Sequence, residues 1–235
     1  WIIYHEGEGA RSQGISVEEK FLRDAALLEK ECAKEPADTR SKFYLAQSYH
    51  NAGMNELAYQ HYAERAMMNG WDEENFIAQL RTGNIAAVLD KPYSEVVEAL
   101  TKAHQMRPSR AEALHALAVY HRKREMYEQA YNYAKMATQL PLPNDRLFVE
   151  RDVYDWRRFD ELSVAAYWTG KYTESRDISE TLLQLHQQQK IQLDDSSVQR
   201  MLDNLKFSLQ KLSETHISIE SDIYSELLIG AGPSN

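Results

Sequence analysis

Two stretches of the chain repeat the same pattern at an offset of 34 residues. The segment PYSEVVEALTKAHQMRP (92–108) aligns with MYEQAYNYAKMATQLP (126–141), which places Tyr93 on Tyr127. A fixed period of this length is typical of chains built from stacked helical hairpins, in which each hairpin buries its apolar face against its neighbours. The sequence therefore predicts an all-α fold whose core is shared between successive hairpins.

Thirty-four residues is the period of the tetratricopeptide repeat, whose small residues let the two helices of a hairpin approach closely. We predict an α-solenoid of about four hairpins over residues 36–190. The recognisable copies lie in residues 41–66, 111–137 and 159–183, with a degenerate copy between the first two. Gly83 replaces an expected Leu in the degenerate copy. Ser175 and Ser179 replace an expected Ala and an aromatic residue in the last copy.

Two insertions interrupt the period. One falls near residues 70–75 (GWDEEN), and the other spans residues 141–156 (PLPNDRLFVERDVYDW). Insertions in a solenoid map to loops, and such loops often carry specific functions. A long connection without any role of its own is the alternative for the second insertion.

Both ends of the array are predicted to be covered by capping helices. Ser16 and Glu19 form an S-x-x-E capping box that opens a helix over residues 16–35, and Cys32 on its apolar face is interpreted as a small buried residue. A second capping helix is expected over residues 195–213, with Asp195 or Ser196 as its N-cap. Its apolar stripe consists of Val198, Met201, Leu202, Leu205, Leu209 and Leu212. Residues 214–235 are predicted to be a mobile tail, and residues 1–15 a short orphan β-strand followed by a loop.

The sequence contains no motif that supports catalysis. It has no P-loop, G-x-S-x-G or H-E-x-x-H motif, its eight histidines do not form an i, i+4 pair, and the one cysteine cannot form an intrachain disulfide. Acidic runs such as Asp72-Glu73-Glu74 and Asp160-Glu161 stand at predicted helix starts, where the helix dipole favours carboxylates. We expect no metal or cofactor site in this chain.

Charge and hydropathy exclude further classes of function. The formal net charge of −9 argues against nucleic acid as a partner, because phosphate binding needs a basic surface. No apolar run approaches the roughly 18 residues of a membrane helix. We predict a cytoplasmic protein without a membrane span.

The repeat predicts a concave groove lined by the first helix of each hairpin. A protein or peptide is the expected groove ligand, and a glycan acceptor is an alternative. The residues placed in the groove by repeat position are Gln47, Asn51, Arg81, His115, Arg122, Asp160 and Tyr167. The Lys/Asn clamp with which some tetratricopeptide proteins hold a peptide carboxylate is not reproduced.

Sequence segments outside the repeat positions show a more specific resemblance to a known family. HEGEGARSQG, KFLRDAALLEKE, FYLAQSYHNAG, HYAERAMMNGWDEE, RPSRAEALHALAVYHR and LFVERDVYDWRRFDELSVAAYWTGKY follow one another in order. Together they resemble the helical region that follows the catalytic domain in bacterial family 2 glycosyltransferase-like proteins, over roughly residues 4–185. The most specific words are NGWDEE, RPSRAE and LFVERDVYDWR, which a generic repeat would not share.

This resemblance implies an upstream α/β domain that binds a nucleotide-sugar and a divalent metal through a D-x-D motif. No D-x-D occurs in this chain. Residues 1–15 would then be the last strand and exit loop of that domain, with His5 and Arg11 at the edge of the donor site, and their alternative role is to pack or cap the junction.

The function expected from these observations is that of a non-catalytic module of a glycosyltransferase-like protein. It would bind or position an acceptor protein or a partner subunit. The alternative is a free-standing protein–protein interaction scaffold unrelated to glycosyl transfer. An autonomous enzyme is disfavoured, because no catalytic group of residues converges.

Overall fold

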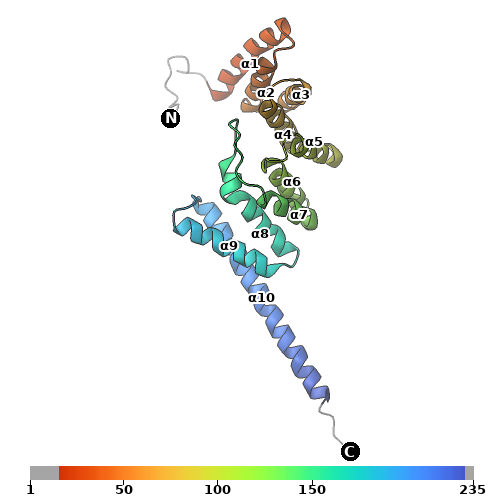
Figure 1. Cartoon of the computed structure of the whole chain (residues 1–235), viewed down its shortest axis with the longest axis vertical. Coiled ribbons are helices and arrows are strands. Elements are labelled where there is room, and N and C mark those ends of the chain that lie inside the picture. Colours follow the sequence, from red (N-terminus) through yellow and green to blue (C-terminus); the bar gives the residue numbers. More distant parts are fainter. Residues whose placement is uncertain (1–15, 231–235) are drawn as a thin grey trace, which may run out of the picture. The chain divides into compact units, whose positions relative to one another are not determined.

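The computed structural model describes residues 16–230, with side chains through residue 214 (Figure 1). Every regular element in this range is a helix, so the predicted all-α fold is confirmed there. The elements are α1 (Val17–Lys34), α2 (Thr39–Asn51), α3 (Asn55–Met67), α4 (Asp72–Val88), α5 (Tyr93–Met106), α6 (Glu112–Lys123), α7 (Tyr127–Thr138), the π-helix η1 (Val153–Arg157), α8 (Arg158–Trp168), α9 (Tyr172–Gln187) and α10 (Asp195–Gly230). The strand predicted in residues 1–15 lies outside the described residues. Among residues 16–230, no helix combines the length and the apolar character needed to cross a bilayer.

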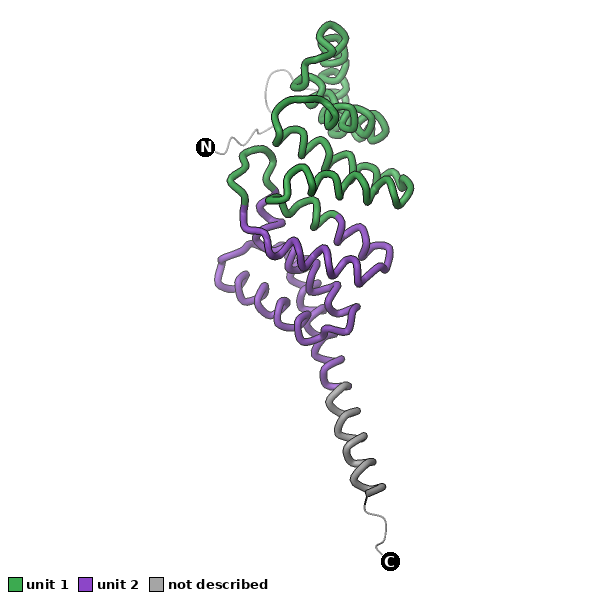
Figure 2. Tube along the Cα trace, turned by 45° about the vertical axis from the view of Figure 1, so that its right-hand side comes forward, with its two compact units in different colours: residues 1–116, 143–149 green, residues 117–142, 150–235 purple. Residues whose placement is uncertain are grey.

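The chain divides into two compact units (Figure 2). Unit 1 contains the described residues up to Ala116 together with Pro143–Val149. Unit 2 contains Leu117–Leu142 and the residues from Glu150 onward. The loop Pro143–Val149 therefore belongs to unit 1, although residues of unit 2 precede and follow it in the sequence.

Unit 1 is built from the hairpins that the repeat predicts. Helix α2 packs on α1 and on α3, α3 packs on α4, and α4 packs on α5. Ala46 and Ala58 are fully buried where the repeat calls for small residues. A Cβ added at Gly83 would lie 2.5 Å from Cδ2 of Leu100, so glycine permits the close approach of α4 and α5. This contact explains why the degenerate copy carries Gly where the pattern prefers Leu.

Helix α1 begins as predicted and differs in one detail. The Ser16 hydroxyl accepts the backbone N–H of Glu19, the Glu19 carboxylate accepts the N–H of Ser16, and the capping box is confirmed. Cys32 is half-buried rather than buried, so its interpretation as a core residue is wrong. Partial burial raises the pKa of its thiol, which disfavours the reactive thiolate.

Buried serines hold unit 2 together where α8, α9 and α10 meet. Ser163, Ser175, Ser179 and Ser208 are each at most 1 % exposed. The hydroxyl oxygens of Ser163 and Ser179 are 2.7 Å apart, and the Ser208 hydroxyl donates to that of Ser175 at 2.9 Å. Buried hydroxyls are tolerated when they bond one another, and their small volume allows the helices to pack closely. The serines that made the last repeat look weak are therefore its packing residues.

Helix α10 corrects three expectations. Asp194, not Asp195 or Ser196, caps its first turn, because Oδ1 of Asp194 accepts the N–H of Ser197 at 2.7 Å. The helix does not end near residue 213 but continues to Gly230, so the tail expected from residue 214 is helical up to that point, and its mobility stays a prediction. The predicted apolar stripe is only partly buried: Met201 is fully buried, whereas Leu202 and Leu209 are 45 % and 46 % exposed.

The two insertions form different structures. The first lengthens the connection after α3 and supplies the first turn of α4, which begins at Asp72. The second is irregular through Val149, and its last residues enter the π-helix that starts at Val153, so it is not a loop over the whole predicted range 141–156.

Candidate functional site

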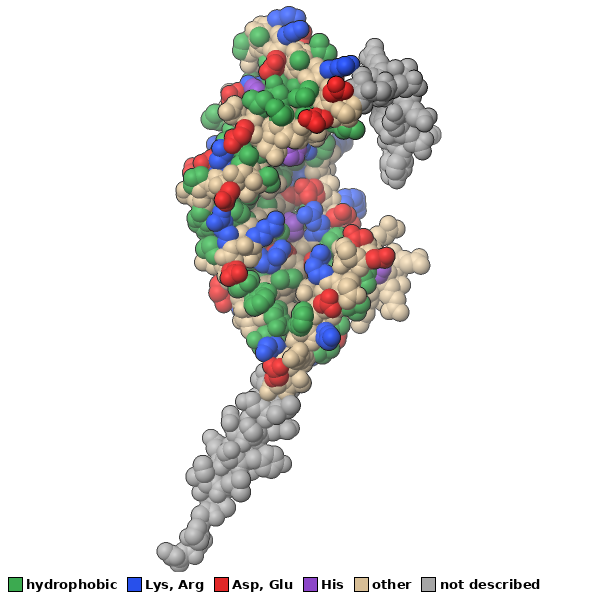
Figure 3. Space-filling view, turned by 180° about the vertical axis from the view of Figure 1, so that it is seen from behind, with side chains coloured by type: hydrophobic (Ala, Val, Ile, Leu, Met, Phe, Trp, Pro, Cys, Tyr) green, Lys and Arg blue, Asp and Glu red, His purple; other side chains and the backbone are tan. Residues whose placement is uncertain are grey.

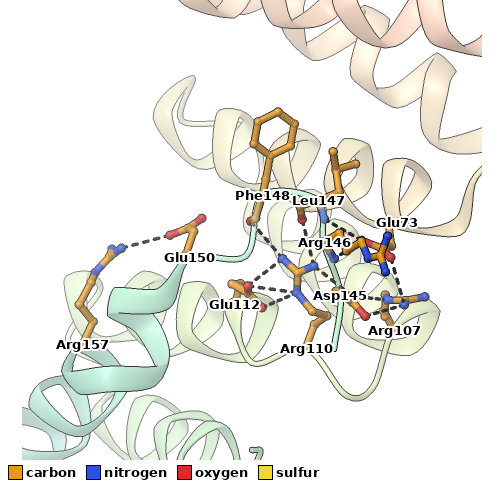
Figure 4. Close-up of polar contacts among 10 residues, drawn as sticks. All are labelled: Glu73, Arg107, Arg110, Glu112, Asp145, Arg146, Leu147, Phe148, Glu150 and Arg157. Carbon is orange, nitrogen blue, oxygen red and sulfur yellow. Dashed lines mark hydrogen bonds and ion pairs between the residues drawn. The ribbon is translucent and has the colours of Figure 1, made fainter. Parts of the chain in front are cut away.

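The loop Pro143–Val149 packs onto unit 1 through a cluster of arginines and carboxylates (Figure 4). The cluster draws on the first turn of α4, the connection between α5 and α6, and the loop itself. The first two segments correspond to NGWDEE (69–74) and RPSRAE (107–112), and the loop runs into the start of LFVERDVYDWR (147–157), with Asp145 and Arg146 just before it. Three separate departures from the repeat thus meet in one place.

Glu73 holds the backbone of the loop. Its Oε2 accepts the N–H of Arg146 at 2.9 Å and the N–H of Leu147 at 2.7 Å. A carboxylate that accepts two backbone N–H groups forms charge-assisted hydrogen bonds, which are stronger than neutral ones. Glu73 therefore does more than complement the dipole of α4, the role that its position at the helix start had indicated.

Arg110 holds the same loop from the other side and is itself fully buried. Its Nε and Nη2 donate to the carboxylate of Glu112 at 2.9 and 2.8 Å, and its Nη1 donates to Asp145 at 3.1 Å. It also donates to the carbonyls of Leu147 and Phe148 at 3.2 and 3.1 Å. A buried guanidinium is stable only when its donors are satisfied by acceptors in good geometry, as they are here.

Asp145 links the loop to a second arginine. Nη2 of Arg107 donates to its carboxylate at 2.6 Å, and Nε of Arg107 donates to the other oxygen. These hydrogen bonds, assisted by those from Arg110, hold the pKa of Asp145 below its ordinary value. The carboxylate is therefore charged at neutral pH, and the pair is the bidentate type that fixes orientation as well as distance.

The clamped backbone places Phe148 in a conformation that bulky residues rarely adopt. Its φ is 45°, in the left-handed region that favours glycine. Such strain persists only where surrounding contacts impose it, here the bonds from Glu73 and Arg110 to the adjacent peptide groups. Figure 4 shows the Phe148 ring projecting away from the charged cluster. The ring stacks on Phe43 of α2, with centroids 6.2 Å apart, and remains 43 % exposed.

Arg81 is the predicted groove residue that lies at this loop. Its guanidinium sits 5.2 Å from the ring centroid of Phe148 and 5.6 Å from that of Tyr62, and it donates to the Tyr62 hydroxyl at 2.9 Å. Burial lowers the pKa of the neighbouring His50, and the charge of Arg81 lowers it further, which leaves this imidazole neutral at pH 7. The sequence identified Arg81, but not the ring that the loop places on it.

The other predicted groove residues of unit 1 lie elsewhere. Gln47 and Asn51 face a pocket between α1 and α2. This pocket is lined by Phe21, Asp24, Leu27, Leu28, Tyr44, Gln47, Ser48 and Asn51. His115 is buried on α6. The common role of these three residues in ligand binding stays a prediction.

In unit 2, the predicted groove residues are engaged with neighbouring helices. Arg122 donates to Glu161 at 2.6 Å, Arg200 of α10 donates to Asp160 at 2.7 Å, and the ring of Tyr167 lies 6.3 Å from that of Phe207 on α10. Helix α10 therefore contacts the α8 positions that the repeat assigns to the groove. Burial raises the pKa of Asp160 and of Glu161, against the opposing effect of their arginine partners.

Glu73, Arg110, Asp145 and Phe148 are not among the site residues predicted from the sequence. For Glu73 and Arg110 the available signal was the charged residues of NGWDEE and RPSRAE, whereas Asp145 and Phe148 carry no such signal beyond their place in the second insertion. His5 and Arg11 lie outside the described residues. Within the described part of the chain, no group of three or more His, Cys, Asp or Glu residues is placed to hold a metal ion.

Comparison with known proteins supports the fold. No protein-family model matches the chain, and neither does any curated protein sequence. Among solved structures, MamA is 14 % identical with a TM-score of 0.58, covering 74 % of this chain and 88 % of MamA. BtubC from P. vanneervenii is 12 % identical with a TM-score of 0.60, covering 93 % of each chain.

A third structural neighbour is described as having TPR-like repeats. A kinesin-light-chain-like protein of Podosopora anserina with nearly identical TPR-like repeats is 16 % identical, with a TM-score of 0.54 over 79 % of this chain and 92 % of that chain. Identities this low establish the fold alone. The chain has the fold of a tetratricopeptide-like α-solenoid.

Proposed function

We propose that the chain is a protein-interaction module that binds a segment of a partner protein on unit 1, where the loop Pro143–Val149 lies against α2 and α4. The observation that carries the proposal is the loop itself. Glu73 of the first insertion and Arg110 of the α5–α6 connection hold its backbone, and the ring of Phe148 stays partly exposed at a residue with positive φ. Exposed residues on a rigidly positioned loop more often serve recognition than packing.

The mixed distribution of charged side chains on one face of the molecule supports recognition through specific residue pairs. On the face shown in Figure 3, acidic and basic side chains are interspersed rather than gathered by sign. A surface of this kind steers partners weakly over long distances, so its specificity comes from particular contacts.

Photo-cross-linking in cells tests this proposal. The photoreactive residue p-benzoylphenylalanine is placed at Tyr44 on α2, near Phe43, and at the exposed Val88 at the end of α4 as a matched control. We expect cross-links from position 44 to one defined segment of a partner protein and none from position 88. Equal labelling from both positions, or none from position 44, would contradict the proposal.

We further propose that this module belongs to a glycosyltransferase-type protein and positions its acceptor in the cytoplasm. The ordered sequence segments support this, and two of the most specific, NGWDEE and RPSRAE, supply Glu73, Arg107, Arg110 and Glu112 of the loop cluster. A nucleotide-sugar and a divalent metal would then bind in the upstream domain. The reading frame before Trp1 provides the first test, since it should encode an α/β domain with D-x-D.

A functional comparison provides the second test. Removal of residues 16–230 from the longer protein should leave nucleotide-sugar hydrolysis intact and abolish transfer to the acceptor protein. An upstream frame without such a domain would favour the free-standing interaction scaffold instead.

A further inference from the structure

Two exposed aromatic rings contact Phe43 on unit 1, each with an arginine over it. Tyr44 is 40 % exposed and meets the edge of Phe43, while Phe148 is 43 % exposed and stacks on Phe43. The guanidinium of Arg40 lies 5.5 Å from the ring centroid of Tyr44, and that of Arg81 lies 5.2 Å from that of Phe148. We call these five residues the arginine–aromatic patch.

The arginines of this patch are not matched by carboxylates. Among the residues that the structure describes, no carboxylate oxygen lies within 4.0 Å of the guanidinium of Arg81 or Arg40. Asp38 lies near Arg40, but its carboxylate accepts hydrogen bonds from the Ser41 hydroxyl and from the backbone N–H groups of Arg40 and Ser41, not from the Arg40 guanidinium. Nearby, Arg107 and Arg110 are both paired with acids.

The position of Arg81 is set before any partner arrives. Its hydrogen bond to the Tyr62 hydroxyl and its stacking between two rings restrict its rotamers. A pre-positioned arginine loses less conformational entropy when it pairs with a ligand. Aromatic rings and arginines are also the residues most enriched at the energetic centres of protein interfaces.

We infer that the arginine–aromatic patch binds a partner-protein segment in which an acidic side chain stands next to an aromatic or large aliphatic one. The acidic group pairs with Arg81, and the apolar side chain covers the ring of Phe148. The inference rests on the proposed interaction function and adds the chemistry of the partner. Because Phe148 comes from the insertion, this recognition site does not follow from the repeat itself.

Selection from a random dodecapeptide phage library on the purified full chain tests the inference. Three variants are compared with the wild type: Arg81→Gln, Phe148→Gly and the control Arg23→Gln, which removes an exposed arginine of α1. Glycine is chosen at position 148 because it accepts the positive φ, so the loop can keep its backbone while it loses the ring. Circular dichroism verifies that each variant is folded.

The expected outcome differs for each variant. The wild type and Arg23→Gln should enrich peptides with Asp or Glu adjacent to Phe, Tyr, Trp or Leu. Arg81→Gln should lose the acidic preference, and a synthetic peptide of the selected type should bind it about tenfold more weakly, with the wild-type affinity falling as salt is added. Phe148→Gly should keep the acidic preference and lose the apolar one.

Two results would overturn the inference in distinguishable ways. Enriched peptides without acidic bias, or with the same bias on Arg81→Gln, would refute the role of the patch and leave the interaction function standing. No enrichment over selection without protein would count against both the patch and the proposed function.

Discussion

Replacement of Gly83 by Ala tests whether α4 and α5 pack too closely to accept a methyl group that helix propensity alone would favour. In an exposed helix, alanine is favoured over glycine by about 1 kcal/mol. At Gly83 the added methyl would lie 2.5 Å from Cδ2 and 2.7 Å from Cγ of Leu100, about 1 Å closer than ordinary carbon contacts allow. Leu100 is 1 % exposed and its backbone nitrogen lies 3.2 Å from the same position, so the clash is relieved only if the buried core repacks.

Helix propensity and the clash with Leu100 have opposite effects on the free energy of unfolding, and the clash is the larger of the two. Overpacking of a filled core costs about 1–3 kcal/mol. After subtraction of the helix-propensity gain, Gly83→Ala is expected to destabilise the protein by about 1 kcal/mol. Leu100→Ala alone should cost about 2–5 kcal/mol, since it opens a cavity. The double variant should cost less than the sum of both, because the methyl at position 83 then occupies part of that cavity.

Urea unfolding followed by circular dichroism at 222 nm measures all four proteins of this cycle. The slopes of the transitions must agree before their midpoints are compared. A gain of about 1 kcal/mol in Gly83→Ala, as at an exposed helical glycine, would refute the close approach of α4 and α5. Strict additivity in the double variant would refute the specific contact with Leu100.

Three further predictions follow from the backbone, the loop and the buried serines. Gly53 and Gly170 have φ of 74° and 76° with open space around the Cβ position, so alanine at either should cost about 1 kcal/mol through backbone strain alone, and asparagine less, as thermal unfolding would show. The lowered pKa of Asp145 means that its stabilising contribution is complete above its unfolded pKa near 4 and is lost as the pH falls through the folded pKa. Asp145→Asn should therefore flatten the acid limb of a stability–pH profile, and an unchanged limb would exclude this carboxylate as its source. Ser208→Ala should destabilise the protein by about 1 kcal/mol through the lost hydrogen bond to Ser175, whereas Ser208→Leu should destabilise it by about 1–3 kcal/mol through overpacking. Equal urea midpoints for both variants and the wild type would contradict the close packing of α9 and α10.

The repeat hairpins and the capping box could be predicted because they depend on contacts that are close in the sequence or recur at a fixed period. The role of Glu73 could not, because a carboxylate at a helix start already has a sufficient local explanation, while its hydrogen-bond partner lies more than seventy residues away. The exposure of Leu202 shows a different limit. An amphipathic stripe indicates which face of a helix is apolar, but not how much of that face a neighbour covers.

Within the candidate site, Arg81 and Phe148 likewise differ in whether local sequence could have predicted their position. The repeat position of Arg81 predicts a groove residue, a role that stays a prediction, and the structure shows its guanidinium beside the ring of Phe148. Phe148 stands in a loop whose path depends on bonds from two distant segments, and no local pattern specifies a positive φ at a phenylalanine.

The assignment of Pro143–Val149 to unit 1 has a consequence for synthesis of the chain on the ribosome. Glu73 emerges well before the N–H groups of Arg146 and Leu147 that it binds. Arg110 has Glu112 two residues away but emerges well before its other acceptors, Asp145 and the carbonyls of Leu147 and Phe148, because residues 117–142 must be translated in between. At roughly 5–20 residues per second, unit 1 waits some seconds for its last seven residues. During that interval a guanidinium destined for complete burial remains open to water and to chaperones. A fragment that ends at Leu142 would leave unit 1 permanently at this stage.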